Sequence, residues 1–306
     1  MKKPILAIVL LTVFCFCFTA CKSGDYKTAT ELLAAKDYAS AAAIFETLGD
    51  YKDSADKLSE CTEMISAIEK FNAALKALTE KNDVLNSEID AANELVRSDD
   101  KALDESLRTT LETAISTAKA AIVSAPEQPV TATATDAAAD EIAAVDYSGI
   151  TEQLKEKKDA MEKSMKQYAL VNAPSEAYVI QCLQKVDGVI DISAATEDND
   201  PNGHLHKAGG YSAAVFFSHK NVDQSSVYGD TIIEKGTSCG GQVEVYQTEA
   251  DAEKRNEYLT GFDGTLFDSG SHTVIGTVIV RTSDQLTASQ QKELEANVIA
   301  ALTALE

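Results

Sequence analysis

The sequence contains no tryptophan, and aromatic residues make up only 6% of its 306 positions. So few large side chains are typical of a helical protein with a modest core. Positive charge is also scarce, because 27 Lys and Arg residues face 49 Asp and Glu residues, for a formal charge of −22. Such a surface repels nucleic acids and anionic lipid headgroups. We therefore expect no nucleic-acid partner.

Cysteine is too scarce for a disulfide framework. Three of the six cysteines lie within the first 21 residues, which leaves Cys61, Cys182 and Cys239. Three is an odd number, so a complete set of disulfides is excluded, although Cys182 and Cys239 could still pair. The sequence has no C-x-x-C pair, so a zinc or redox site of that kind is unsupported.

A long hydrophobic run occurs only once, at residues 4–20 (PILAIVLLTVFCFCFTA), directly after Lys2 and Lys3. The run is shorter than a typical membrane span and follows a short positive region at the N-terminus. It therefore predicts a secretory signal peptide over residues 1–20. No later run is long enough to span a bilayer.

The end of this run, Phe18-Thr19-Ala20-Cys21, resembles the bacterial lipobox, in which small residues precede a cysteine. The resemblance implies cleavage before Cys21 and a diacylglycerol on its thiol. Two acyl chains anchor a protein far more firmly than one. We therefore expect an extracytoplasmic lipoprotein held at the cell membrane by its lipid. An ordinary signal peptide or an uncleaved anchor is the alternative. Loss of residues 1–20 removes two lysines and no acid, which takes the charge from −22 to −24.

Residues 21–61 predict a short tether followed by a helical hairpin. Ala29 and Ala41 lie twelve positions apart and allow two helices to approach closely, while Tyr38 and Phe45 fill the space between them. The pattern resembles one tetratricopeptide unit. A single unit cannot bury its own apolar face. We therefore expect the hairpin to pack on the next domain rather than to form a peptide groove.

Residues 62–98 carry the strongest periodicity. Two interleaved apolar series recur every seven residues: Ile68, Leu75, Asn82, Ile89 and Val96, and Phe71, Leu78, Leu85 and Ala92. This heptad seam predicts one long helix, and Asn82, its one polar member, would fix register or partner number.

Two further amphipathic helices are predicted, at 101–123 and 148–170. Between them, Pro126 and Pro129 and an Ala/Thr bias indicate a loop or weak helix at 124–146. We expect residues 62–171 to form a long antiparallel three-helix bundle that acts as a stalk. An intermolecular coiled coil through the first helix is the alternative.

From residue 172 to 306 the pattern alternates between helix and strand. We predict strands at 188–196, 211–219, 241–248 and 273–282, and helices near 176–186, 249–262 and 287–305. Thr287 and Gln290 have the spacing of a capping box. These segments predict a small four-stranded α+β sandwich with helices on one face of the sheet. The stretch GSHTVIGTVIVRTSDQLTASQQKELEANV resembles a C-terminal domain of Gram-positive surface lipoproteins, some labelled matrix-binding-like, which implies a surface location.

The stretch TEDNDPNGHLH at 196–206 places Asp198, Asp200, Asn202 and Gly203 at the spacing that opens a calcium loop. An EF-hand also needs flanking helices and a glutamate at the twelfth position, which here is Gly209. The EF-hand is therefore excluded.

Three interpretations of this stretch stay open. One is a different calcium site, built by Asp198, Asp200 and Asn202 with the help of Glu197. A second is a transition-metal site at His204 and His206. A third is a plain polar turn.

Weaker chemical candidates are His272 as a base, Arg281 as a cation and Asp230 as an acid, all within the C-terminal domain. No catalytic motif of known spacing is present. We therefore expect a cell-envelope lipoprotein that displays a domain for binding an envelope protein, a glycan or a small ligand. An envelope enzyme or a purely structural spacer is the alternative.

Overall fold

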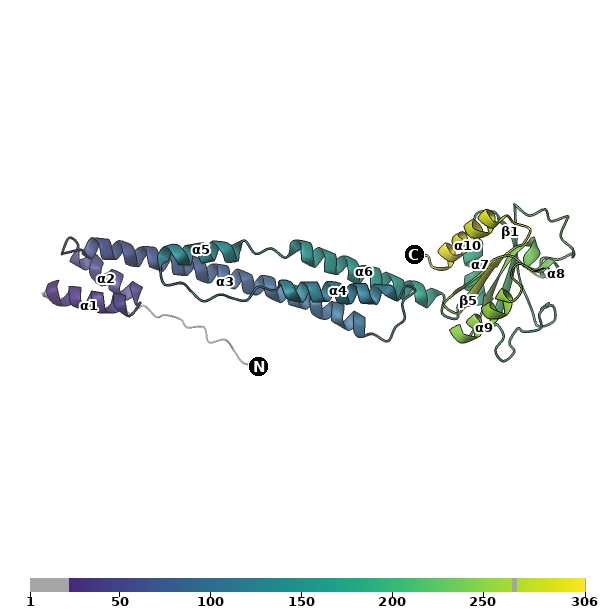
Figure 1. Ribbon diagram of the computed structural model, residues 1–306, viewed down its shortest axis with the longest axis horizontal. Coiled ribbons are helices and arrows are strands. Elements are labelled where there is room, and N and C mark those ends of the chain that lie inside the picture. Colours follow the sequence, from purple (N-terminus) through teal and green to yellow (C-terminus); the bar gives the residue numbers. More distant parts are fainter. Residues whose placement is uncertain (1–21, 266–268, 306) are drawn as a thin grey trace. The chain divides into compact units, whose positions relative to one another are not determined.

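The structure of the protein is a computed structural model that describes residues 22–265 and 269–305. The predicted signal peptide and Cys21 lie outside these residues. Within them the fold is α+β, with helices and one five-stranded antiparallel sheet (Figure 1). The chain divides into two compact units, Met1–Leu85 with Ala121–Tyr147 and Asn86–Ala120 with Ser148–Glu306. We call them the N-terminal unit and the C-terminal unit.

The N-terminal unit contains α1 (Lys22–Ala34), α2 (Tyr38–Leu48), the first part of α3 (Ser54–Arg97) and α5 (Ala132–Ala143). Helices α1 and α2 form the hairpin that the alanine spacing predicts. Ala29, Ala41 and Phe45 are fully buried in its core. Small side chains at the crossing allow the two helices to approach, and the aromatic ring fills the remaining space.

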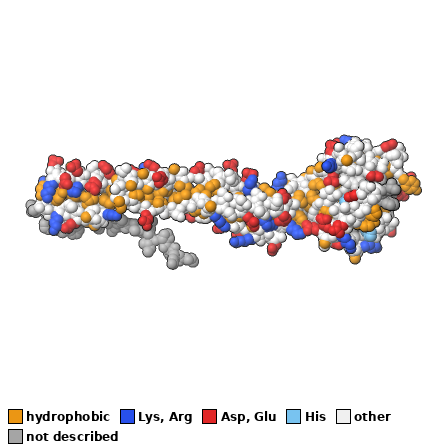
Figure 2. Space-filling view, in the orientation of Figure 1, with side chains coloured by type: hydrophobic (Ala, Val, Ile, Leu, Met, Phe, Trp, Pro, Cys, Tyr) orange, Lys and Arg blue, Asp and Glu red, His pale blue; other side chains and the backbone are white. Residues whose placement is uncertain are grey.

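Helix α5 lies in the stretch that the sequence analysis left as a loop or weak helix. Thr131 caps it by accepting a hydrogen bond from the backbone of Ala134 at 3.3 Å. Its Ile142 packs against Phe71 and Leu78 of α3, and this burial supplies the stabilisation that a short isolated helix lacks. Hydrophobic side chains gather along the visible face of this unit, with charged side chains beside them (Figure 2).

Asn82 forms its hydrogen bonds within its own chain. Its amide nitrogen donates to the backbone oxygen of Val123 at 3.0 Å, and its amide oxygen accepts from the Tyr147 hydroxyl at 2.8 Å. The same hydroxyl accepts from the backbone nitrogen of Val123 at 2.9 Å. Asn82 thus fixes both ends of the segment that contains α5. An intermolecular coiled coil stays a prediction.

The helical part of the C-terminal unit consists of the end of α3, α4 (Ser106–Ala121) and α6 (Ser148–Leu170). Helix α4 begins later than the expected residue 101. The Arg108 guanidinium donates to the backbone oxygens of Val96 at 2.6 Å and Ser98 at 3.2 Å, so it caps the end of α3. The residues before Ser106 therefore form a turn.

The sheet has the strand order β1-β2-β3-β5-β4, with every neighbouring pair antiparallel. Its strands are β1 (Val189–Ala194), β2 (Ala213–His219), β3 (Gly240–Val245), β4 (His272–Ile275) and β5 (Val278–Thr282).

The expected number of four strands was wrong, because the segment 273–282 folds back on itself. Gly276 has φ +59°, and a Cβ there would lie 2.6 Å from the backbone oxygen of Val171. Only glycine fits this turn.

The expected placement of helices on one face of the sheet was also wrong. Helices α7 (Glu176–Leu183) and α10 (Ala288–Leu302) cover one face, and α8 (Ile232–Lys235) and α9 (Glu249–Thr260) cover the other (Figure 1). The reason is visible in β2, where every residue is buried. Successive side chains point to opposite faces, so such a strand needs cover on both sides. The short 3₁₀ helix η1 (Gly236–Cys239) follows α8.

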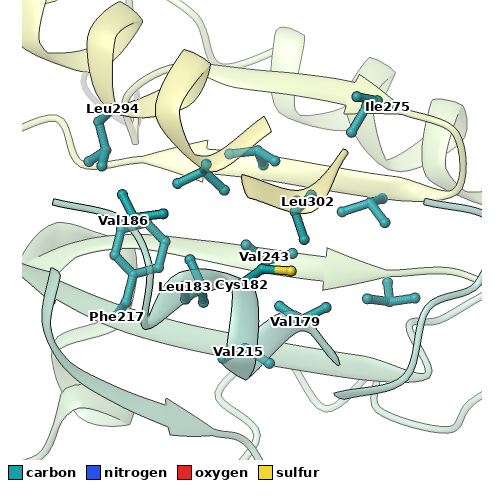
Figure 3. Close-up of a cluster of buried hydrophobic side chains, with 14 of the residues drawn as sticks. Val179, Cys182, Leu183, Val186, Val215, Phe217, Val243, Ile275, Leu294 and Leu302 are labelled. Atoms are coloured by element: carbon teal, nitrogen blue, oxygen red, sulfur yellow. The ribbon is translucent and has the colours of Figure 1, made fainter. Parts of the chain in front are cut away.

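The α7/α10 face carries the larger apolar core. Side chains from both helices meet those of the central strands there (Figure 3): Val179, Leu183, Val215, Phe217, Val243, Leu294 and Leu302. The predicted capping box of α10 is confirmed, since Thr287 and Gln290 hydrogen-bond each other reciprocally.

The predicted domain boundary at residues 171 and 172 is a fixed joint within the C-terminal unit. The backbone oxygen of Val171, at the end of α6, accepts from the backbone nitrogen of Thr277 at 3.0 Å and from its hydroxyl at 3.2 Å. The same hydroxyl accepts from the backbone nitrogen of Ala173 at 2.6 Å. The turn between β4 and β5 therefore attaches the sheet to the end of α6.

Candidate ligand-binding cleft and buried charge cluster

The α8/α9 face contains a fully buried carboxylate, that of Glu244 on β3. Arg281 on β5 donates to it at 3.0 Å, Arg255 on α9 donates at 3.2 and 3.3 Å, and the Tyr246 hydroxyl donates at 2.7 Å. Together with Gln242, which also accepts from Arg281, these residues form what we call the Glu244 cluster. Polar groups at this depth are stable only when they are hydrogen-bonded or paired.

The electrostatics of the cluster keep Glu244 ionised. Burial alone would raise the pKa of this carboxyl, but the guanidiniums of Arg281 and Arg255 outweigh it and hold the pKa below its usual range. Burial and the neighbouring carboxylate raise the pKa of Tyr246, so its hydroxyl stays protonated and donates. The cluster therefore holds one negative and two positive charges.

The sheet register places His272 beside the cluster. Gln242 pairs with Arg281 across β3 and β5, and Arg281 pairs with His272 across β5 and β4. The imidazole Nδ1 lies 2.7 Å from the side-chain oxygen of Asn256 on α9, and Nε2 lies 3.1 Å from a carboxylate oxygen of Asp263. The three cross-strand neighbours share the α8/α9 face.

A polar cleft of about 610 Å³ opens at this edge of the sheet, and we call it the His272 cleft. It is lined by Asp263, Thr265, Gly270, Ser271, His272, Asp284 and Gln291. Such a lining offers both hydrogen-bond donors and acceptors, with little apolar surface for a hydrophobic ligand.

The wall that leads into β4 is held in place by its neighbours. Arg281 donates to the Ser269 hydroxyl at 2.8 Å. The Ser271 hydroxyl lies 2.7 Å from the hydroxyl of Thr282 and donates to Glu295 of α10 at 3.0 Å. Gly270 between them has φ +93°, and a Cβ there would lie 2.1 Å from the backbone oxygen of Thr282. The wall is therefore set before any ligand arrives.

The arrangement suits binding better than nucleophilic chemistry. Ser271 directly precedes β4, which begins at His272, and neighbouring side chains of an extended segment point to opposite sides. Accordingly, the hydroxyl of Ser271 contacts Thr282 and Glu295 rather than the imidazole. A serine nucleophile would need a base within hydrogen-bond reach.

Burial disfavours the thiolate at two of the remaining cysteines, Cys61 and Cys239. Cys61, Cys182 and Cys239 are all buried and none of them is in a disulfide, so the possible bond between Cys182 and Cys239 is not formed. Burial raises the pKa of the Cys239 thiol to about 11. A thiol with that pKa is protonated near neutral pH and is a poor nucleophile.

Of the three chemical candidates from the sequence, the structure brings two together. His272 and Arg281 are direct cross-strand neighbours. Asp230 lies elsewhere, just before α8, where its backbone nitrogen donates to Glu234 at 2.9 Å. Helix α8 contacts β1 and β2, which lie toward the opposite edge of the sheet from β4.

The candidate metal loop at 196–206 is organised around Asp200. Its carboxylate accepts backbone hydrogen bonds from Asn202 at 3.1 Å, His204 at 2.7 Å and Leu205 at 2.8 Å, and a further one from the Tyr211 hydroxyl. Burial on its own would raise the pKa of Asp200, but these donors lower it. The carboxylate therefore folds the loop.

The side chains of the other candidate ligands in this loop are exposed or have other partners. Asp198 and Asn202 are exposed. His206 faces Glu197 at 3.0 Å, whereas His204 packs edge-on against the ring of Tyr211. Across the described residues, no three His, Cys, Asp or Glu side chains form a group that could hold a metal ion. A calcium site at Asp198, Asp200 and Asn202 stays a prediction.

Sequence reasoning missed the Glu244 cluster. A signal was present, because Gln242 and Glu244 alternate with apolar residues in GGQVEVYQT. That alternation indicates a strand with one solvent-exposed face. Only the packing of α9 shows that this face is buried. Arg255, in a highly charged helix, gave no indication of a buried role.

Comparison with protein-family models, curated proteins and solved structures found no match for this chain. Among residues 22–265 and 269–305, no helix has the length and apolar character needed to cross a bilayer.

Replacing Asp200 with alanine is expected to cost about 2 kcal/mol of unfolding free energy, because several donors lose a charged acceptor. Asp198→Ala is the matched control and should change stability by less than about 0.5 kcal/mol. Denaturant unfolding of both variants measures this. The series is repeated with chelator and with calcium at about 1 mM. If calcium stabilises the unchanged chain and Asp198→Ala abolishes that effect, the loop is a metal site.

Glu244→Gln is expected to destabilise the protein by about 3 kcal/mol, because two buried guanidiniums lose their counter-charge. The folded pKa of Glu244 lies below its unfolded value near 4.5, so its contribution is present above that pH and is lost as the pH falls through the folded pKa. Denaturant unfolding at several pH values should therefore show a shallower acid-side loss in the variant. Glu253→Gln, at an exposed position of α9, is the control, and equal stability of the two variants would contradict the prediction.

Proposed function

We propose that this chain is a lipid-anchored protein of the bacterial cell envelope. Its C-terminal α+β domain binds an uncharged polar ligand in the His272 cleft. The anchor rests on the apolar run at 4–20 and on Cys21. The charge of −24 that remains after residue 20 argues against anionic partners such as nucleic acid.

The observation that carries the binding proposal is the fixed wall of the cleft. Ser269, Ser271 and His272 each have a side-chain partner that sets their position. A site that is ordered in advance spends less free energy on ordering when a ligand arrives.

The mixture of charges around the cleft favours an uncharged ligand. Asp263 and Asp284 line it and accept hydrogen bonds, and the His272 imidazole lines it beside Asp263. An anion would meet the two carboxylates, and a cation would have to compete with the His272 imidazole for Asp263. A neutral molecule with many hydroxyl groups can use both kinds of partner. Among the envelope ligands that the sequence analysis leaves open, a glycan fits this chemistry best.

An enzyme is less well supported. A catalytic base needs a reacting partner within hydrogen-bond reach. The hydroxyl of Ser271 is turned away from His272, and Asp230 lies at another part of the sheet. The geometry therefore favours binding over turnover.

Replacing Cys21 with serine is expected to abolish lipid attachment, because serine has no thiol to acylate. The full chain is expressed in a bacterium with radiolabelled palmitate, and labelling is measured in the membrane fraction. Cys61→Ser, a change at a buried cysteine, is the control and should keep the label. Undiminished labelling of Cys21→Ser would show that the lipid is attached elsewhere, and absence of label from the unchanged chain would show that no lipid is attached.

Asp263→Ala is expected to weaken binding to purified, protein-free cell-wall glycan by about tenfold, since the cleft loses a charged acceptor. The detergent-solubilised full chain is sedimented with the glycan at a series of concentrations. Asp230→Ala removes an acidic residue outside the cleft and should bind like the unchanged chain. Equal binding by all three proteins would place the glycan site elsewhere, and no binding by any of them would reject a glycan ligand.

A further inference from the structure

The turn between α2 and α3 packs against the first turns of α1. The Tyr26 hydroxyl donates to the Asp53 carboxylate, and the rings of Tyr26 and Tyr51 pack edge-on with their centroids 5.9 Å apart. The hairpin of α1 and α2 therefore brings the residue between Tyr51 and Asp53, which is Lys52, back to the end of α1 that follows Cys21.

Lys52 is held over two aromatic rings in this turn. Its ammonium nitrogen lies 4.1 Å from the centroid of the Tyr26 ring and 5.4 Å from that of the Tyr51 ring. These contacts position the ammonium, but a ring face is no substitute for the oxygen acceptors that its three N–H donors can bind. Within residues 22–265 and 269–305, the ammonium has no carboxylate at ion-pair distance. Lys52 is thus a positioned cation with donors available for an oxygen ligand.

A cleft of about 450 Å³ opens beside Lys52, with its other lining residues on α1, and we call it the Lys52 cleft. The carboxylates around it already have cationic partners. Glu31 of the lining pairs with Lys27 at 3.8 Å, and Asp53, next to Lys52 in the chain, pairs with Lys57 at 3.7 Å. The positive charge of Lys52 is therefore left for a ligand.

The cleft is close in the chain to the predicted lipid. Helix α1 begins at Lys22, the residue after Cys21. The helix rises about 6 Å from Lys22 to Tyr26, and one peptide unit adds about 3.8 Å, so Tyr26 is at most about 10 Å from Cys21. The headgroup layer is about 5 to 8 Å deep on each side of the hydrocarbon core. A lipid on Cys21 therefore holds the Lys52 cleft at the level of the headgroups.

We propose that the Lys52 cleft binds the phosphate of a membrane phospholipid beside the anchor, with the Lys52 ammonium donating to a phosphate oxygen. This inference rests on the proposed lipid anchor. It adds a second attachment, because acyl chains on one residue leave the hairpin free to turn, whereas a phosphate held at Lys52 fixes its orientation on the membrane.

The residue types of the cleft suit this position. Tyrosine is enriched at membrane–water interfaces because its ring is apolar and its hydroxyl is polar. Lysine is a compact positive charge that binds phosphate well. The charge of −24 repels an anionic surface as a whole. Contact is therefore confined to the Lys52 cleft, where the neighbouring carboxylates are already paired.

The test uses the absence of tryptophan from the chain. Tyr51→Trp introduces a single indole beside Lys52 and keeps an aromatic ring there. The lipidated full chain is reconstituted into vesicles of equal parts phosphatidylcholine and phosphatidylglycerol, with a small share of lipid that carries a nitroxide on its headgroup. Nitroxide quenches indole fluorescence at short range. Tyr38→Trp, about 20 Å away at the other end of the hairpin, is the matched reporter and should be quenched less.

Lys52→Gln, added to the Tyr51→Trp chain, should lower the ratio of docked to undocked hairpins about fivefold and so weaken the quenching. Lys36→Gln is the matched control and should keep it. Lys36 is also exposed, has φ +64° against +53° for Lys52, and lies at the other end of the hairpin. Vesicles of digalactosyldiacylglycerol, whose headgroup has no phosphate, should give the quenching of the Lys52→Gln chain.

The outcomes separate this inference from the proposed function. Equal quenching of the two reporters, or quenching unchanged by Lys52→Gln or by the galactolipid, would overturn the phosphate contact and leave the lipid anchor in place. The mass of each purified chain shows whether Cys21 carries lipid. A chain without lipid there would reject both the anchor and this inference, and sedimentation with cell-wall glycan would still test the His272 cleft.

Discussion

The carboxylate of Glu244 lies entirely out of contact with solvent, and the α8/α9 face is built around it. Removing a carboxylate from water costs several kcal/mol, and attraction to opposite charges offsets this only when the geometry is good. Arg281 comes from β5 and Arg255 from α9, so one side chain ties three elements together. If either arginine were removed, Glu244 would lose one of its two counter-charges in the protein interior. Strand order and the position of α9 are therefore constrained by the same ion cluster.

Two outer features of the domain connect to this cluster. On one side, Tyr246 donates to Glu244, and its ring packs edge-on against Tyr211, whose hydroxyl donates to Asp200 of the 196–206 loop. On the other side, Arg281 reaches Ser269 and the cleft wall. The loop and the cleft are thus supported from a common interior. The buried charges contribute to the cleft by fixing the position of its wall, which is the kind of support that a precise binding site needs.

Features that depend on a local sequence pattern could be predicted from the sequence. The capping box at Thr287 and Gln290 and the helical hairpin at Ala29 and Ala41 depend on residues close together in the chain, and both are present. The burial of β2 on both faces could also have been predicted from the sequence, because AAVFFSH shows no alternation of apolar and polar residues. Such a strand is expected to have other elements packed on both faces of its sheet.

What could not be predicted depends on contacts between distant residues. The turn at Gly276 has no room for a side chain because the backbone of Val171 passes close to it, and nothing near Gly276 in the sequence indicates that approach. Helix α5 is stable because α3 supplies an apolar face for Ile142. The candidate site shows the same limit. His272 and Arg281 could be chosen as polar residues near a strand, but their pairing depends on the register of β4 and β5.

The joint at Val171 shows that the α+β domain is attached to the helix that precedes it. The sequence pattern changes at residue 172 and predicts a domain boundary there, and Thr277 holds this segment through backbone and side-chain hydrogen bonds. Tyr168 of α6 also donates to Glu249 at the start of α9, at 2.8 Å, and Leu103 packs against the core of the α7/α10 face.

A chain cut at residue 172 would expose these partners and would lose the support that α6 gives to the turn between β4 and β5. That turn begins directly after β4, which carries His272. The helical residues of the C-terminal unit therefore support the α+β domain directly, and the His272 cleft is best regarded as a property of the whole unit rather than of residues 172–306 alone.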